Sequence, residues 1–354
     1  GISAGDAATI AAARNFTFSD TFSAILAEVG DDLLVYNIAT GKAARLTSAP
    51  GDETNASFSP DGRFVSFVRD GDLYCVDVET QRERRLTTDG GPNRLNGRLD
   101  WVYEEELYGR GETTGYWWSP DSLSIAFLSL DETPVPFYAI VDDAGPDQGV
   151  EMTRYPRAGD PNPIVTLGVV PALGGPTQWM DLSAWEAPDR LVSRVAWSPD
   201  SRNVVFQVQD RVQSRLELVA ADRDTGVGKR LIREESKYWI DVIGNPEWLP
   251  DGSFLWLSDR SGFRHVYHYA ADGKLLKAVT TGAWDVRELY GASADGWIYF
   301  QGAEHSPLEN HVYRVRLDGT GMTRLTDLDG DHAANFNSQM SMFVDVSSDI
   351  RTPP

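Results

Sequence analysis

The sequence predicts an all-β fold, a β-propeller of seven or eight four-stranded antiparallel blades whose first blade is either complete or incomplete at the N-terminus. Three observations support this prediction. A four-strand unit of roughly 40 to 50 residues recurs along the chain. The turns inside each unit are Asp-Gly or Pro-Asp-Gly, which suit tight turns. No helical periodicity separates the units, and a β-sandwich would not repeat its turns so regularly.

The clearest unit is ASFSPDGRFVSFVRDGDLYCVDVETQRERRLTTDG, residues 56–90. It divides into an apolar strand, a turn at SPDG, the strand FVSFV, a DG turn, the strand LYCVDV and a closing strand RERRLT. The segments between the turns alternate or are rich in β-branched and aromatic residues, as strands are. The unit therefore reads as one antiparallel meander.

Partial or nearly complete copies of this unit follow the same order of strands and turns. They lie at 30–47, 116–130, 195–210, 246–282 and 290–326, and 336–351 reads as the opening of another. We therefore expect residues 1–354 to form a single β-propeller domain. Residues 1–15 are expected to be disordered or an appended segment, because the chain opens on Gly1 and lacks the regions of a signal peptide.

Composition excludes several function classes. The net charge of −21 would repel nucleic acid and anionic lipid. A single cysteine, Cys75, excludes an internal disulfide and a cysteine-based zinc site. Only His265 and His268, of five histidines, are close in sequence, so we expect no metal site and no cofactor. No apolar run approaches the roughly 20 residues of a membrane span.

Two segments interrupt the repeat, and function is expected there because inserted loops cost little stability and can carry specific chemistry. The first is GPNRLNGRLDWVYEEELYGRGETTG, residues 91–115, which we expect to hold a helix or loop bearing glutamates. The second, about 131–193, reads as an extended blade with extra proline turns.

The first insertion contains the run DWVYEEELYG, which predicts a short helix. Asp100 is a plausible N-cap and Gly109 a stop, and one apolar side is formed by Trp101, Val102, Leu107 and Tyr108. At about 100° per residue, two of Glu104–Glu106 can converge on one point while the third faces elsewhere. Acids in the first turn also complement the helix dipole.

Three adjacent glutamates permit more than one interpretation. A charge run is usually a solvated surface turn. Two carboxylates held on an anchored helix in a confined place would instead have their repulsion relieved by a cation, an amine being the first candidate. Calcium stays open, although two carboxylates are few for an ion that prefers six to eight oxygens.

The motifs NGRLDWVYEEELY, GYWWSPD, SLDETPVPFY, YPRAGDPNPIVTLGVV, DRSGFRHVY and TTGAWDV occur in this order. Together they closely resemble the N-terminal propeller domain of the dipeptidyl peptidase IV family, serine peptidases of the prolyl oligopeptidase type. The resemblance implies an exopeptidase that releases N-terminal dipeptides, often after Pro or Ala. It also implies that Glu105 and Glu106 bind the α-amino group of the peptide.

The resemblance leaves other site residues less defined. Family members bind the substrate backbone with an arginine, and the corresponding stretch ILAEVGDDLL has none. Arg110 could substitute for it, a surface role being as probable, and Trp239 lies where the family's propeller lines the substrate side. Asp100, Trp101 and Tyr103 are expected to support the glutamates.

Catalysis in the family belongs to a Ser-Asp-His triad in an α/β-hydrolase domain that follows the propeller, with serine in a G-x-S-x-G elbow. We expect no such elbow here, no catalytic residue, and no hydrolysis by this chain alone. The alternative is a stand-alone propeller that binds peptide N-termini or protein partners.

The resemblance also suggests partners and a location. The expected partners are a peptide with a free N-terminus, the C-terminal α/β-hydrolase domain of a parent chain and, in the parent enzyme, a possible second copy. The resemblance favours a periplasmic or extracellular location, and a cytoplasmic one stays open.

Overall fold

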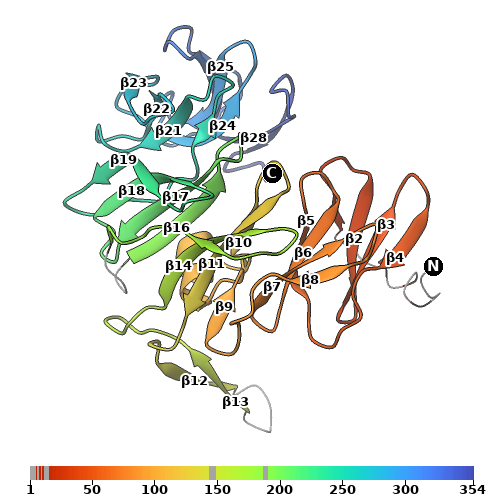
Figure 1. The fold of residues 1–354 in the computed structure, drawn as a ribbon. Coiled ribbons are helices and arrows are strands. Elements are labelled where there is room, and N and C mark those ends of the chain that lie inside the picture. Colours follow the sequence, from red (N-terminus) through yellow and green to blue (C-terminus); the bar gives the residue numbers. More distant parts are fainter. Residues whose placement is uncertain (1–4, 6–7, 9, 12–15, 143–148, 186–189) are drawn as a thin grey trace. The chain divides into compact units, whose positions relative to one another are not determined.

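The computed structural model describes residues 5, 8, 10, 11, 16–142, 149–185 and 190–354. The expectation for residues 1–15 falls almost wholly outside this part of the chain. Two compact units, 1–229 and 230–354, make up the structure, and each is described by itself (Figure 1). The assignment of 1–354 to a single domain stays a prediction. Within the described residues, no helix is long and apolar enough to cross a membrane.

Unit 1 is built from antiparallel sheets whose strands follow one another in space as they do in the chain. The first two sheets are β1 (Thr17–Phe18), β2 (Ala24–Val29), β3 (Asp32–Asn37) and β4 (Lys42–Arg45), then β5 (Thr54–Phe58), β6 (Phe64–Arg69), β7 (Asp72–Asp77) and β8 (Glu83–Arg85). The third contains β10 (Tyr116–Trp118), β11 (Ser124–Asp131), β14 (Ile164–Pro171) and β15 (Gln178–Trp179), with β9 (Arg94–Asn96) also paired to β11. The fourth is β16 (Arg190–Trp197), β17 (Asn203–Asp210), β18 (Arg215–Asp222) and β19 (Gly228–Glu235), and the boundary between the units falls inside β19.

Unit 2 repeats the same plan. Its sheets are β20 (Glu247–Trp248), β21 (Phe254–Ser258), β22 (His265–Tyr269) and β23 (Leu275–Ala278), then β24 (Val286–Ala292), β25 (Trp297–Gly302), β26 (His311–Arg316) and β27 (Thr323–Arg324). A pair of strands, β28 (Asp331–Phe336) and β29 (Phe343–Ser348), follows where the sequence predicted the opening of another blade. The all-β prediction of four-stranded antiparallel blades is confirmed.

Serine and aspartate side chains shape the turn between the first two strands of a blade. Ser59 Oγ donates to Asp61 Oδ1 at 2.6 Å, and Ser119 and Ser198 do the same to Asp121 and Asp200. In two of these turns the fourth residue is a serine with positive φ, Ser122 and Ser201. Each hydroxyl accepts the backbone N–H of the aspartate in the preceding blade's turn at 3.0 Å. We call these two contacts the serine clasps.

Threonines of the closing RLT and VTT segments tie the last strand of a blade to its third strand. Each threonine Oγ1 accepts the N–H of the third strand's second residue, at 2.8 to 3.2 Å. The pairs are Thr47 with Leu33, Thr87 with Leu73, Thr280 with Val266, and Thr326 with Val312. The residue just before that N–H, which is His265 or His311 in unit 2, is therefore held at a fixed place in each blade.

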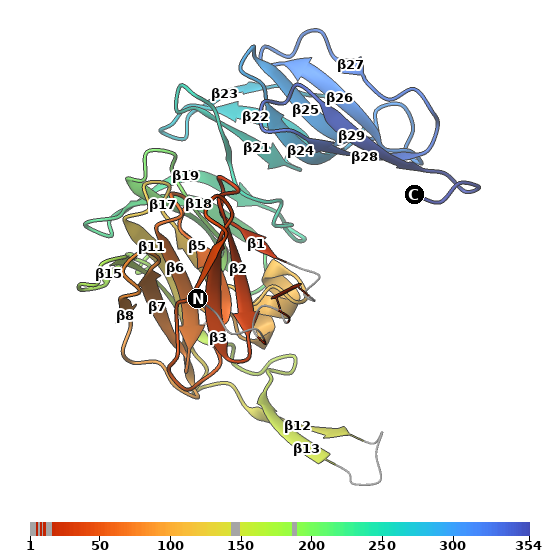
Figure 2. The same ribbon diagram turned by 90° about the vertical axis from the view of Figure 1, so that its right-hand side faces the viewer.

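Both insertions lie in the third blade. The first supplies β9 and the π-helix η1 (Tyr103–Tyr108) ahead of β10. The second, between β11 and β14, contains the hairpin β12 (Phe137–Asp142) and β13 (Gly149–Arg154), a paired ribbon that projects from the sheets of unit 1 (Figure 2). The sequence had predicted an extended blade here. The structure places a separate hairpin between two strands of an otherwise regular sheet.

Candidate functional site

The glutamate run lies on a short helix whose ends are set by the two predicted residues. Asp100 Oδ1 accepts the Tyr103 N–H at 3.1 Å and Oδ2 the Val102 N–H at 3.4 Å, as an N-cap should. Gly109, at φ 117°, donates its N–H to Glu104 O at 3.0 Å. That bond spans five residues, so the turn is a π-helix and not the α-helix expected. A π-helix is wider and turns each residue through less than 100°, which brings neighbouring side chains closer together.

Buried contacts with β16 anchor this helix. Tyr103 is fully buried, and its hydroxyl accepts the Val192 N–H at 3.2 Å. The guanidinium of Arg194 donates to Leu107 O and lies 5.1 Å from the centre of the Tyr108 ring. The helix is therefore fixed to β16 from two sides, and its glutamates project from a rigid support.

Asp100, at the start of the helix, and Glu132, which feels the charge of Asp100, are two poorly solvated carboxyl groups. Asp100 is 4% exposed, and burial raises its pKa to about 6 although backbone N–H groups pull the other way. Glu132 is also buried. Its burial, reinforced by the charge of Asp100, raises its pKa to about 7 against the opposing charges of Arg154 and Arg98. These two acids therefore interact with each other close to the helix start, and sequence reasoning missed Glu132 because nothing in SLDETP distinguishes it from a surface acid.

The three glutamates have different surroundings. Glu104 accepts the Gly111 N–H at 3.2 Å. Glu105 has a side chain that is 23% exposed and forms an ion pair with Arg110, whose Nε lies 3.0 Å from each carboxylate oxygen. This hydrogen-bonded contact lowers the pKa of Glu105. Glu106 is exposed and has no hydrogen bond or ion pair with any residue that the structure describes.

Two further site candidates take different positions. Arg110 is 84% exposed and is committed to Glu105. Trp101 packs on Tyr155, with ring centres 4.3 Å apart, and so joins the helix to the base of the β12–β13 hairpin. The formal charges of Glu105, Glu106 and Arg110 sum to −1, and Glu104 adds another negative charge on the same helix.

Trp239 belongs to unit 2, where it is 56% exposed and lines a cavity of about 320 Å³. The same cavity is bordered by Glu234 and Arg260, which form an ion pair. Sequence reasoning missed both residues, although the motif DRSGFRHVY contains Arg260. The cavity offers an aromatic surface beside paired charges, a combination suited to peptide groups.

The expectation that the sequence contains no G-x-S-x-G pentapeptide is wrong. Residues 1–5, GISAG, do have the G-x-S-x-G spacing, and Ser3 lies outside the described residues. A nucleophile elbow joins a strand to a helix at the edge of an α/β sheet. The described sheets are antiparallel meanders, so this pentapeptide carries no argument for catalysis.

Comparisons with known proteins agree with the motifs. Residues 18–354 match the family model described as the dipeptidyl peptidase IV (DPP IV) N-terminal region. A probable dipeptidyl peptidase 4 of Aspergillus flavus is 30% identical over 295 residues, 78% of this chain and 38% of the relative. A probable dipeptidyl-aminopeptidase B of Talaromyces marneffei is 31% identical over 302 residues, 77% of this chain and 33% of the relative.

Solved structures give the same result. The crystal structure of Porphyromonas gingivalis dipeptidyl peptidase 4 matches with a TM-score of 0.87 and 29% identity, over 96% of this chain and 50% of that one. This chain therefore spans half or less of the length of these relatives.

Proposed function

This chain belongs to the family of dipeptidyl peptidase IV N-terminal regions, and from that premise we propose that it selects peptides by their free N-terminus for a dipeptide-releasing serine exopeptidase. Glu105 and Glu106 are the proposed ligands of the peptide α-ammonium group. The observation that carries the proposal is the π-helix, which presents one glutamate already paired with Arg110 and an adjacent one without a partner.

Simple electrostatics supports an ammonium ligand. A protonated α-amine donates three hydrogen bonds, and two carboxylates can accept them as charge-assisted bonds. The charge of +1 also brings the sum over Glu105, Glu106 and Arg110 to zero. An acylated N-terminus would carry no charge and would leave the glutamates without a cation, so the site discriminates against blocked peptides. Because the helix is rigid, the distance from the amine to the next peptide bonds is fixed as well.

The test uses the full-length protein that contains this chain, assayed with an Xaa-Pro chromogenic substrate. Glu105→Gln or Glu106→Gln should lower kcat/KM by roughly 30- to 1,000-fold, which corresponds to roughly 2 to 4 kcal/mol for losing one carboxylate partner of the bound ammonium group. Glu104→Gln is the matched control, because glutamine can still accept the Gly111 N–H, and it should stay within a few-fold of wild type.

N-acetylation of the same substrate should abolish turnover by the wild type. Equal turnover of free and acetylated substrate would refute the amine assignment. The stand-alone binding alternative has a distinct signature, namely that this chain binds free peptide N-termini and the full-length protein does not hydrolyse them.

A further inference from the structure

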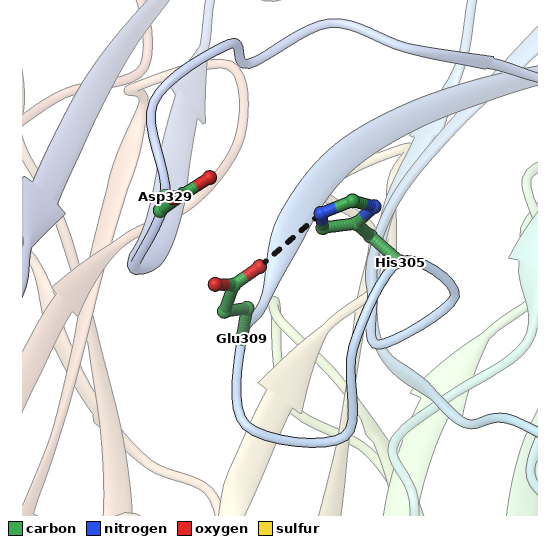
Figure 3. Close-up of side chains that lie close together, drawn as sticks. All are labelled: His305, Glu309 and Asp329. Atoms are coloured by element: carbon green, nitrogen blue, oxygen red, sulfur yellow. Dashed lines mark ion pairs between the residues drawn. The ribbon is translucent and has the colours of Figure 1, made fainter.

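Unit 2 contains a cluster of histidine and carboxylate groups that the proposed peptide site does not use. His305 and Glu309 lie in the loop between β25 and β26, and Asp329 lies in the loop between β27 and β28 (Figure 3). One potential ligand atom from each residue lies within 4.8 Å of those of the other two. His305 Nε2 is 3.7 Å from Glu309 Oε2. The side chains therefore converge on one small volume from two separate loops.

Backbone contacts hold the two loops together. Asn310 donates its N–H to Gly330 O at 3.3 Å, and its carbonyl accepts the His332 N–H at 2.9 Å. Gly330 has a φ of +130°, and a Cβ there would lie 2.4 Å from Ser348 O, so the second loop is pressed against β29. The His305 N–H donates to the hydroxyl of the buried Tyr313 at 3.1 Å. The convergence is thus built into the backbone.

A buried histidine orients one of the carboxylates. His311 Nδ1 lies 3.0 Å from Thr326 Oγ1, and its Nε2 lies 3.2 Å from Glu309 Oε2. A carboxylate can only accept, so Nε2 of His311 donates its N–H to Glu309. Such an outer contact fixes a ligand in metal sites.

A histidine at the same place in the preceding blade has a different partner for its Nε2. His265 occupies the same place on β22, with Nδ1 3.0 Å from Thr280 Oγ1. Its Nε2 lies 3.1 Å from the Gly282 carbonyl oxygen, so the partner of this nitrogen is a backbone acceptor and not a carboxylate. Only at His311 does the equivalent nitrogen face a carboxylate that also approaches a second histidine.

We propose that His305, Glu309 and Asp329 bind a divalent first-row transition ion, with Zn²⁺ as the ion of choice, and that His311 is a positioning residue for Glu309. One imidazole and two carboxylates are a donor set that Zn²⁺ accepts, with a remaining position for water. Ca²⁺ and Mg²⁺ prefer oxygen ligands alone and are disfavoured by His305. The bound ion would fasten the β25–β26 loop to the β27–β28 loop, and this proposal does not depend on the peptide site.

The experiment titrates chelator-treated chain with ZnCl₂ and follows heat release and the melting temperature. We expect one equivalent of Zn²⁺ to bind and to raise the melting temperature, with no competition from equal concentrations of Mg²⁺ or Ca²⁺. His305→Ala and Asp329→Asn, both at exposed positions, should each weaken binding at least about 10-fold, and His311→Gln should weaken it by about 10- to 100-fold as an outer-contact change does.

Two control variants separate this site from unspecific binding. Glu304→Gln removes a charge beside the cluster, and His268→Gln removes a histidine elsewhere in unit 2, so both should bind Zn²⁺ as the wild type does. Circular dichroism of each variant establishes that it is folded. The absence of stoichiometric binding, undiminished binding by folded Asp329→Asn, or equal competition by Ca²⁺ would each overturn the proposal.

Discussion

The two insertions of the third blade differ in how they meet the rest of unit 1. The first buries Asp100 and Tyr103 completely or nearly so, and its helix is bonded to β16. The hairpin β12–β13 has all six residues of β12 exposed, including Phe137 and Ile140. Both insertions belong to the same blade, so the location of an insertion does not decide its role. Buried anchors decide whether it can hold a side chain to the accuracy that a binding site needs.

The largest expected effect tests the anchor of the first insertion. Tyr103→Ala should destabilise unit 1 by about 3 to 5 kcal/mol, since it removes a fully buried ring and leaves the Val192 N–H without an acceptor. Tyr138→Ala in the hairpin is the matched change and should cost less than about 0.5 kcal/mol. Thermal and urea unfolding followed by fluorescence measure both. Similar losses for the two tyrosines would erase the contrast between the insertions.

The next effect concerns the buried acid Glu132 and depends on pH. The folded-state pKa of Glu132 is raised to about 7, so the ionised form is disfavoured in the fold. Its favourable contribution to stability is complete below the ordinary glutamate pKa and is lost as pH rises through about 7. The free energy of unfolding of Glu132→Gln, relative to that of the wild type, should therefore increase by roughly 1 to 3 kcal/mol between pH 5 and pH 8. Melting temperatures across this range, with the exposed Glu79→Gln as control, measure the gain, and a constant difference would contradict it.

A smaller effect is expected at the helix cap. Asp100→Ala removes the acceptor of two backbone N–H groups and should cost about 1 kcal/mol, within about 0.5 to 2. Asp100→Asn keeps an acceptor. Its loss of unfolding free energy relative to the wild type should become smaller as pH rises, because burial makes the aspartate charge of the wild type unfavourable above its pKa of about 6. Hydrogen exchange of the Val102 and Tyr103 amides reports on the cap directly. Unchanged exchange in Asp100→Ala would show that the helix start is held by other contacts.

The smallest effect belongs to the hairpin. Ile140→Thr and Val150→Thr replace exposed apolar side chains, at 48% and 61% exposure, by another β-branched residue. The free energy of unfolding of the dilute chain should change by no more than about 0.5 kcal/mol. Denaturant titrations at two protein concentrations measure this. A loss above about 1 kcal/mol, or one that depends on concentration, would mean that the hairpin is covered in solution.

The sequence predicted what local chemistry determines. Asp-Gly and Ser-Pro-Asp turns marked the blades, and Asp100 and Gly109 marked the helix ends, because a turn or cap depends on residues close in sequence. The π-helix was not predictable, since it depends on how Tyr103 and Leu107 are held by β16. The grouping of His305, His311 and His332 was missed for a related reason. His305 lies in the loop that leads into the strand of His311, but His332 reaches the His311 ring from β28, and proximity in sequence, on which the expectation of no metal site rested, carries no information about that second contact.

The serine clasps bear on how a chain of this kind can gain or lose whole blades. The hydroxyls of Ser122 and Ser201 each complete the turn of the blade before them, and the turn that each serine belongs to repeats the same Ser-Pro-Asp pattern. A blade whose turn reads Ser-Pro-Asp-Ser can make this contact with a preceding blade that has a Ser-Pro-Asp turn, whereas the turn at 59–62 has Gly62 in place of the second serine. Duplication of a whole Ser-Pro-Asp-Ser repeat therefore keeps the hydrogen bond between neighbouring turns, and a deletion that removes the second serine leaves the aspartate N–H of the preceding turn without this acceptor.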